Sequence, residues 1–350
     1  MKKIKIAIIG TGGMANAHAG DIKRNKHTEL VAAADVDLKK AKDFAVRHGV
    51  PHVFDNQTEL LEKVAVDAVI NVTPDAFHAP LSLEAIAAGK HVLCEKPLAT
   101  GYPDARRMAT AAKRKGIVNM VNFSYRNSPA IQKARILVQK GAIGRPMHFE
   151  ASYLQSWLAT QIWGEWRTSH AWLWRLSTAH GSSGALGDIG VHILDFASMP
   201  LGDYAAVHCR LKAFDKAPGG KIGKYRLDAN DSAIINAEMK NGALGVVHVT
   251  RWATGQRNSL RLRVYGEEGA LIVDLDKGYS QLETCFGKNR IKAEWKTVTC
   301  AKTPSNFERF VDSIRTGNPQ PPDFAQGARI QQVMDACFAS GKSGKTVKVG

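Results

Sequence analysis

Residues 4–15 of the chain read IKIAIIGTGGMA. An apolar run from Ile4 to Ile9 stops abruptly at glycines that fit the pattern G-x-G-x-x-A, and helical spacing follows. Such a strand–turn–helix unit lets the backbone approach a pyrophosphate group at the positive end of the helix. We therefore expect a dinucleotide to be bound by Gly10, Thr11, Gly12, Gly13, Met14 and Ala15.

The alternation of short apolar runs and helical stretches continues to Asn122. It predicts strands at residues 4–9, 30–34, 52–54, 68–72, 91–94 and 117–121, with helices at 14–24, 39–48, 76–88 and 103–115. Alternation of this length implies right-handed crossovers and a parallel sheet. The predicted class is α/β, a doubly wound Rossmann sheet within residues 1–123.

The second predicted strand ends at Asp35, where an acid that accepts the ribose hydroxyls of a dinucleotide is expected. The same carboxylate repels a 2′-phosphate, which favours NAD, although Lys39 and Lys40 nearby leave NADP possible. The alternative is a glycine-rich turn beside a solvent-facing aspartate.

A further loop, NVTPDAFH at residues 71–78, follows the predicted strand at 68–72. Pro74 is typical of a helix start, and that structural role stands beside a functional one. Because ligands bind at the carboxyl ends of parallel strands, we also expect the loop to border the nicotinamide. Its candidate residues are Asn71, Thr73, Pro74 and His78.

The stretch VLCEKPL at residues 92–98 places Lys96 directly after a predicted buried strand. A buried ammonium is costly unless it has a partner or a task. The simplest alternative is a surface ion pair with Glu95, although such pairs stabilise little.

The stretch GALGDIGVHILD at residues 184–195 predicts a helix that continues to about Met199. Asp188 and His192 are four residues apart, so a helix places both on one face, where the carboxylate can orient the imidazole. Histidine is well suited to exchange a proton near neutral pH. The pair could instead only stabilise the helix, and a metal site is not expected because further ligands are missing.

Five of the seven tryptophans lie within 18 residues, at Trp157, Trp163, Trp166, Trp172 and Trp174. Their spacing follows no single helical face. Indole faces with polar neighbours such as Gln155, Arg167 and His170 can pack against a polyhydroxylated ring. A subunit interface or a small satellite core is an equally good interpretation.

The rest of the chain is β-rich, with strands predicted at 148–153, 207–213, 233–239, 245–251, 260–265 and 270–274. Helices close the chain near 306–315 and 324–340. We expect an α+β second domain at residues 124–350, a largely antiparallel open sheet with helices on one face.

Composition adds limits to the function. The 48 Lys and Arg against 32 Asp and Glu give a formal net charge of +16, but the basic residues are dispersed, so no nucleic-acid partner is expected. The first apolar run is too short for a signal peptide or a membrane span. Five scattered cysteines indicate reduced thiols, and we expect a cytoplasmic protein without membrane association.

Taken together, GTGGMA, TPDAFH, CEKPLA and GALGDIGVHILD, with TPSNFERFVDSI and SGKSGKTVKV near the end, resemble the Gfo/Idh/MocA oxidoreductase family. The resemblance implies hydride transfer between NAD, or NADP, and a secondary alcohol of a sugar, sugar derivative or cyclitol. It implies that Lys96 contacts the reacting hydroxyl, that His192 is the acid/base and that Asp188 assists it. A cation there would stabilise the developing alkoxide.

The same resemblance places Glu95 and Lys96 against the cofactor. The substrate is expected to contact Lys96, Arg126, Gln155, Trp157, Trp166, Arg167, Asp188 and His192. A cis peptide before Pro97, and a homodimer or homotetramer built on the other face of the second sheet, also follow from the family.

Two alternatives stay open. One is a redox glycosidase of the same fold that keeps its NAD bound, which the tryptophan-rich stretch would suit. The other is a non-enzymatic, sugar-responsive regulator, against which Lys96, Asp188 and His192 argue.

Overall fold

Two compact units make up the computed structural model, which describes residues 3–350. The first unit joins residues 3–124 to Pro304–Gln331, and the second joins Tyr125–Thr303 to Gln332–Gly350. A single boundary at residue 123 therefore does not describe the first unit fully, because Pro304–Gln331 near the end of the chain also belongs to that unit.

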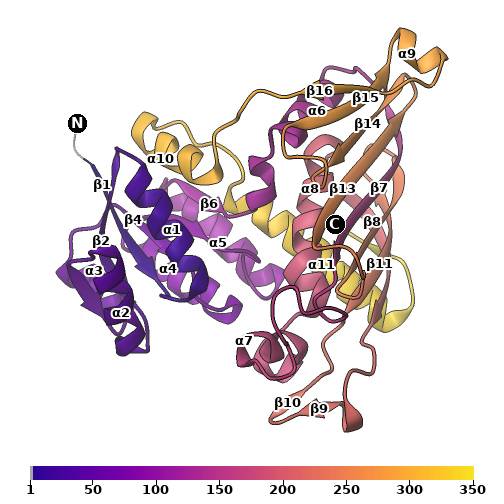
Figure 1. Cartoon of the computed structure of the whole chain (residues 1–350). Helices are drawn as coiled ribbons and strands as arrows, with labels where there is room; N and C mark the ends of the chain where they lie inside the picture. The colour runs from indigo at the N-terminus through magenta and orange to yellow at the C-terminus, as the bar shows by residue number, and fades with distance from the viewer. Residues whose placement is uncertain (1–2) are drawn as a thin grey trace. The chain divides into compact units, whose positions relative to one another are not determined.

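The first unit is built on a six-stranded parallel sheet (Figure 1). Its strand order is β3-β2-β1-β4-β5-β6, the order of a Rossmann fold, so the predicted doubly wound sheet is confirmed. The strands are β1 (Ile4–Ile9), β2 (Thr28–Ala34), β3 (His52–Phe54), β4 (Ala68–Asn71), β5 (His91–Cys94) and β6 (Asn119–Val121). The helices are α1 (Gly13–Arg24), α2 (Leu38–His48), α3 (Gln57–Lys63), α4 (His78–Ala87) and α5 (Tyr102–Lys115), with a 3-10 turn at Asp75–Phe77 before α4. The sequence did not predict α3.

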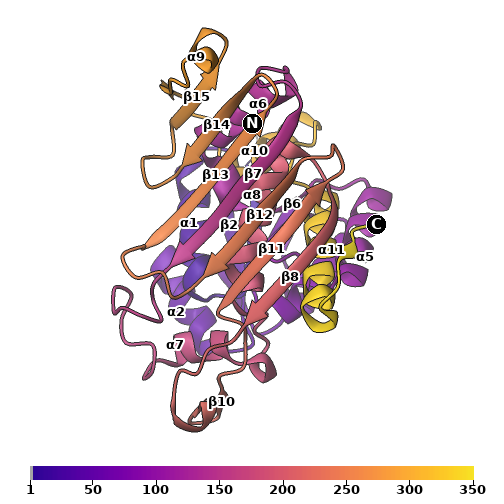
Figure 2. The ribbon, with the colours of Figure 1, turned by 90° about the vertical axis from the view of Figure 1, so that its right-hand side faces the viewer.

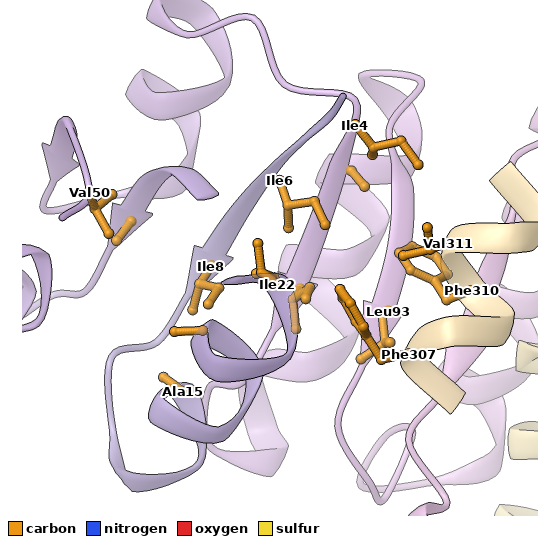
Figure 3. Close-up of a cluster of buried hydrophobic side chains, with 14 of the residues drawn as sticks. Ile4, Ile6, Ile8, Ala15, Ile22, Val50, Leu93, Phe307, Phe310 and Val311 are labelled. Atoms are coloured by element: carbon orange, nitrogen blue, oxygen red, sulfur yellow. The ribbon is translucent and has the colours of Figure 1, made fainter. Parts of the chain in front are cut away.

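Helix α10 (Asn306–Thr316) completes the core of this unit. Phe307, Phe310 and Val311 pack in one cluster with Ile6, Ile8 and Leu93 of the sheet (Figure 3). Phe310 is fully buried. The packing of this apolar helix face explains why Pro304–Gln331 belongs to the first unit.

The second unit contains a nine-stranded sheet in the order β16-β15-β14-β13-β7-β12-β11-β8-β17. The strands are β7 (Pro146–Gln155), β8 (Tyr204–Lys212), β11 (Ser232–Met239), β12 (Leu244–Thr250), β13 (Asn258–Gly266), β14 (Gly269–Asp274), β15 (Gln281–Phe286), β16 (Lys296–Thr299) and β17 (Val347–Lys348). All neighbours are antiparallel except β7 and β12. The predicted, largely antiparallel sheet is confirmed, and β15, β16 and β17 add strands that the sequence did not predict.

One face of the large sheet is covered by helices, as expected. In Figure 2 the strands lie in front of α6 (Pro129–Gln139), α8 (Val191–Leu201) and part of α11 (Phe324–Ser343). Burial alternates accordingly along β11, where Ala233, Ile235 and Ala237 are buried and Ile234 is exposed. Such alternation is typical of an antiparallel sheet with one covered face.

The helix expected from residue 184 begins differently from the prediction. Residues Leu186–Gly190 form a π-helical turn, and the regular helix α8 starts at Val191. A Cβ atom at Gly187 would lie 2.3 Å from the Ser183 side chain, so the residue cannot easily be larger. Asp188 lies in the π turn and His192 in α8, and π turns of this kind are frequent at functional sites.

Smaller elements complete the second unit: α7 (His170–Leu173), α9 (Lys288–Ile291) and the two-stranded hairpin of β9 (Lys221–Ile222) and β10 (Tyr225–Arg226). Within residues 3–350, none of the helices has both the length and the apolar character needed to cross a membrane.

Replacing Phe310 with alanine tests the role of α10. Removing this buried ring leaves a cavity, so Phe310→Ala should lower the free energy of unfolding by about 3–5 kcal/mol in chemical denaturation. Val46→Ala, at a side chain 87% exposed on α2, is the matched control and should change it by less than about 0.5 kcal/mol. A loss no larger than the control's would show that α10 is not part of the core.

Candidate functional site

The glycine-rich turn lies between β1 and α1, as predicted. Gly10 has φ +87°, and a Cβ atom there would lie 2.8 Å from the Val72 carbonyl oxygen, so only glycine fits. Cβ atoms on Gly12 or Gly13 would instead meet nothing within 4 Å. Gly12 is the N-cap of α1 and provides no side-chain cap to its first amides. Open space beside uncapped amides fits the pyrophosphate of a dinucleotide.

Asp35 at the end of β2 is joined to this turn. Its Oδ2 accepts hydrogen bonds from the Thr11 backbone N at 2.8 Å and from Thr11 Oγ1 at 3.0 Å. Its Oδ1 accepts from the Asp37 backbone N at 3.0 Å. The carboxylate is thus fixed beside the glycine-rich turn, where the sequence placed a ribose-binding acid.

The loop after β4 is shaped by Asn71, which is fully buried. Asn71 Nδ2 donates to the His78 carbonyl oxygen at 3.1 Å, and Asn71 Oδ1 accepts from Thr73 Oγ1 at 2.6 Å. Asn71 and Thr73 therefore bind each other and the loop backbone, and Pro74 is exposed at its tip. The structure makes Asn71 a residue that supports this loop from within.

His78 lies beneath the same loop and is 1% exposed. Its Nδ1 is 2.6 Å from the Pro97 carbonyl oxygen and its Nε2 is 2.8 Å from the Thr73 carbonyl oxygen. Carbonyl oxygens only accept, so both ring nitrogens must donate and the ring must be an imidazolium. Burial lowers the pKa of His78, but Cys94, Asp75 and the Pro97 carbonyl outweigh it and raise the pKa to about 10.

Glu95 is buried at the end of β5, beside Lys96. Its Oε1 lies 2.8 Å from both His18 Nε2 and Asn122 Nδ2, and its Oε2 accepts from the Lys96 backbone N at 3.2 Å. Burial raises the pKa of Glu95, but His18, Asn122 and Lys96 together lower it to about 2. The carboxylate is therefore charged at neutral pH and held from two sides.

These contacts fix the backbone on both sides of Lys96. The Glu95 carboxylate is held by His18 and Asn122, and the Pro97 carbonyl is held by His78. The Lys96–Pro97 peptide bond is cis, as the resemblance implied. His18 and Asn122 were not among the predicted site residues, because single polar residues distant in the chain give no spacing signal.

The second unit has a pocket of about 550 Å³ lined by Gln155, Trp157, Trp163, Trp172, Arg175 and Asp188. Three of the predicted substrate residues, Gln155, Trp157 and Asp188, therefore meet around one space. A volume of this size lies within the range of about 300–1,000 Å³ that is typical of small-molecule sites.

Asp188 is anchored by a buried arginine that the sequence did not single out. Arg251 Nη2 donates to Asp188 Oδ2 at 3.0 Å, and the Arg251 side chain has no exposed surface. The same guanidinium donates to the carbonyl oxygens of Arg175 and Gly184 and lies 5.1 Å from the Trp157 ring. Asp188 therefore lines the pocket with its carboxylate held in place by Arg251.

His192 is buried against two tyrosine rings. The Tyr125 ring meets it edge-on at 5.0 Å between centroids, and the Tyr153 ring lies at 6.2 Å. Tyr153 OH donates to Asn258 Oδ1 at 2.6 Å, Asn258 Nδ2 donates to Tyr125 OH at 2.7 Å, and the two hydroxyls are 2.5 Å apart. Because Tyr153 OH donates to Asn258, Tyr125 OH is the donor between the two hydroxyls. The closed set of hydrogen bonds fixes both tyrosine rings beside the imidazole.

Three further predicted substrate residues, Arg126, Trp166 and Arg167, lie elsewhere in the second unit. Arg126 is buried, and its Nε and Nη2 each donate to Asp195 at 2.6 Å. Trp166 is buried and donates to the Leu158 carbonyl oxygen, while the exposed Arg167 stacks on its ring at 4.5 Å. None of the three is a lining residue of the pocket.

The tryptophan-rich stretch forms a satellite core, one of the two alternatives that its spacing left open. Trp157, Leu158, Trp166, Leu173 and Leu176 pack with Tyr225 and Leu227. We call residues 157–180 and 217–227 the tryptophan lobe. Within the described part of the chain, no three His, Cys, Asp or Glu side chains converge on a possible metal position.

The charge of His78 can be measured directly. In ¹⁵N-histidine NMR both His78 nitrogens should stay protonated at pH 8, because the folded pKa of about 10 exceeds the unfolded value of 6.5. The contribution of the charged His78 ring to the free energy of unfolding is fully present below pH 6.5 and is lost as the pH rises towards 10. The destabilisation caused by His78→Gln should therefore shrink over that interval, whereas exposed His52→Gln stays within about 0.5 kcal/mol of wild type. A neutral His78 ring at pH 8 contradicts the assignment.

Comparisons with known proteins identify the family of the chain. Residues 4–123 match a family described as an oxidoreductase family with an NAD-binding Rossmann fold, and residues 131–272 match the GFO/IDH/MocA C-terminal domain. Levoglucosan dehydrogenase of Pseudarthrobacter phenanthrenivorans is 27% identical over 97% of this chain and 96% of its own. The 1,5-anhydro-D-fructose reductase of Ensifer adhaerens is 30% identical over 76% of this chain and 74% of its own.

A solved structure supports the same assignment. Levoglucosan dehydrogenase in complex with NADH and L-sorbose superposes with a TM-score of 0.89, at 27% identity and with all of both chains covered. The glycine-rich turn, the CEKP lysine and the GDIGVH helix thus occur together in one chain of known family fold. The protein belongs to the Gfo/Idh/MocA family of oxidoreductases, whose N-terminal domain binds NAD.

Proposed function

We propose that the protein is an NAD-dependent dehydrogenase for a secondary alcohol of a sugar, sugar derivative or cyclitol, or catalyses the reverse reduction. The observation that carries this proposal is the pocket in which Gln155 and Asp188 lie among indole faces. Polar acceptors beside aromatic rings suit a molecule with hydroxyl groups and an apolar C–H face. The names of the relatives, levoglucosan dehydrogenase and 1,5-anhydro-D-fructose reductase, support a sugar-like substrate.

NAD, when bound, supplies the nicotinamide carbon that accepts or returns the hydride. In our proposal Gly10–Ala15 hold its pyrophosphate and Asp35 accepts hydrogen bonds from its ribose. The fixed Asp35 carboxylate repels a 2′-phosphate, so NAD is preferred over NADP. Thr73 and the Glu95–Lys96 backbone border the nicotinamide.

Lys96 and His192 divide the remaining chemistry. The ammonium of Lys96 stabilises the negative charge that develops on the substrate oxygen as the C–H bond breaks. His192 accepts the hydroxyl proton, or returns it in the reduction, and the tyrosine rings keep its imidazole in place. Asp188, held by Arg251, accepts a hydrogen bond from a substrate hydroxyl.

A screen of sugars and cyclitols with NAD and NADP tests the proposal, followed by variants on the best substrate. His192→Ala should lower kcat by about 10² to 10⁴-fold with NAD affinity nearly unchanged. Lys96→Met, which keeps much of the side-chain volume and removes the charge, should also lose turnover. Lys113→Met, on the exposed surface of α5, is the matched control. Folded variants of Lys96 and His192 with normal turnover would refute the mechanism, and hydrolysis of a glycoside without net NADH formation would favour the redox glycosidase.

We also propose that the protein is a cytoplasmic homodimer or homotetramer. The open face of the large sheet supports an oligomer, because Ile234 and Leu244, from paired strands, are 56% and 58% exposed on it. Five unpaired, buried cysteines support a reducing compartment.

Light scattering after size-exclusion chromatography tests the oligomer. The wild type should elute with the mass of two or four chains, and Ile234→Lys should shift it towards one, because a charge on an apolar interface is costly. Ile291→Lys, at a side chain 83% exposed on α9, is the control and should leave the mass unchanged. A monomeric wild type at micromolar concentration contradicts the proposal.

A further inference from the structure

The pocket of the second unit extends beyond the residues to which the family resemblance assigned a role. A chain of contacts runs along it: Asp188 binds Arg251, Arg251 lies over Trp157, and Trp157 packs on Trp172 at 5.1 Å between ring centroids. Trp163 lies parallel to Trp172, with an interplanar angle of 10° and 6.1 Å between centroids. Trp163 and Trp172 are therefore the indoles of the pocket most removed from Asp188 along this chain of contacts, and the Arg175 guanidinium lies 5.4 Å from the Trp172 ring.

We propose that Trp163, Trp172 and Arg175 form a second sugar-binding subsite, so that the substrate is a disaccharide or other glycoside. The ring that reacts lies at Asp188, and the second ring stacks on the indoles of this outer subsite. The proposal rests on the proposed function and adds the size of its substrate.

The indoles of the outer subsite are only partly covered by protein. Trp157 and Trp166 are each 2% exposed within the satellite core, whereas Trp163 and Trp172 pack against that core, are half-buried and line the pocket. A half-buried indole in a pocket wall offers a flat apolar face, and the C–H face of a pyranose ring fits such a surface.

Arg175 adds polar donors next to these faces. Its guanidinium lies 4.5 Å from the Trp174 ring and 5.4 Å from the Trp172 ring, and Nη1 donates to the Ala171 carbonyl oxygen at 2.6 Å. This stacking fixes the plane of the guanidinium and leaves further N–H groups for hydroxyls. Aromatic faces with fixed donors match a polyhydroxylated ring better than an apolar group.

The lobe that carries the subsite is preorganised. The β9–β10 hairpin packs beside the 3-10 turns that follow α7, below the end of the large sheet in Figure 1. Arg251 donates to the Arg175 carbonyl oxygen and thereby ties the lobe to β12 and Asp188. A rigid platform binds a second ring without an added ordering cost.

The volume agrees with a substrate larger than one ring. The pocket of about 550 Å³ lies within the range of sites for drug-sized ligands, which have more atoms than a monosaccharide.

The experiment compares D-glucose with cellobiose, maltose and trehalose as substrates of the full-length protein with NAD, measured as kcat/KM from NADH formation. The kcat/KM of at least one disaccharide should exceed that of glucose by about tenfold or more, because loss of an apolar contact typically costs that much. Trp163→Ala should reduce this disaccharide-to-glucose ratio of kcat/KM to within about threefold, and Trp163→Phe should restore most of it. Trp295→Ala, at a tryptophan 41% exposed outside the lobe, should keep the wild-type ratio. Near-ultraviolet circular dichroism confirms that the variants are folded.

The outcomes separate the two proposals. Equal kcat/KM for all four sugars, a preference for glucose, or a ratio unaffected by Trp163→Ala overturns the outer subsite while the dehydrogenase stands. Absence of NADH formation with every sugar and cyclitol of the wider screen overturns the proposed function and the subsite together.

Discussion

The parallel pairing of the six strands is the constraint that positions the residues of the nucleotide-binding half. Because these strands all run in the same direction, the carboxyl ends of β1, β2, β4 and β5 lie at the same edge of the sheet. Residues far apart in sequence then bind one another: Thr11 donates to Asp35, and His78 joins the carbonyls of Thr73 and Pro97. The site at this edge is a consequence of the topology and of short polar contacts that stiffen it.

Buried charges occur where the structure must hold a side chain or a loop still. Removing one partner of a buried pair is strongly unfavourable, and such pairs are a costly way to gain stability alone. Three such pairs occur here: Glu95 with His18, Arg251 with Asp188, and Arg126 with Asp195. Asp188 is partly exposed, and the other five side chains are largely buried. Two of these pairs directly support residues with a proposed chemical role, Lys96 and Asp188. Their cost is therefore better explained by positioning than by stability.

The sequence predicted what depends on periodicity and on local motifs. The strands at 4–9, 52–54 and 91–94 agree with the structure to the residue, and the turn at Gly10 lies where the motif placed it. It could not predict contacts between isolated polar residues, so Arg251, Asn258 and Arg175 were missed. The position of α10 was missed for a related reason: an amphipathic helix shows that one face is buried, but not which sheet buries it. The roles of Arg126, Trp166 and Arg167 in substrate binding stay predictions, and their contacts with Asp195, Leu158 and Glu165 give each a structural role as well.

Arg251 makes chemistry and substrate size interdependent in the second unit. One buried guanidinium contacts the Asp188 carboxylate, the Trp157 ring and the backbone of Arg175. A shift of the tryptophan lobe must therefore either move the Arg251 guanidinium, and Asp188 with it, or break the hydrogen bond from Arg251 to the Arg175 carbonyl oxygen. Since β12 leads directly into Arg251 and pairs with β7, which leads into Trp157, the rigid sheet sets the position of both groups. Substitutions in the lobe can therefore change which sugar ring binds only if Arg251 keeps its contacts with Asp188 and Trp157.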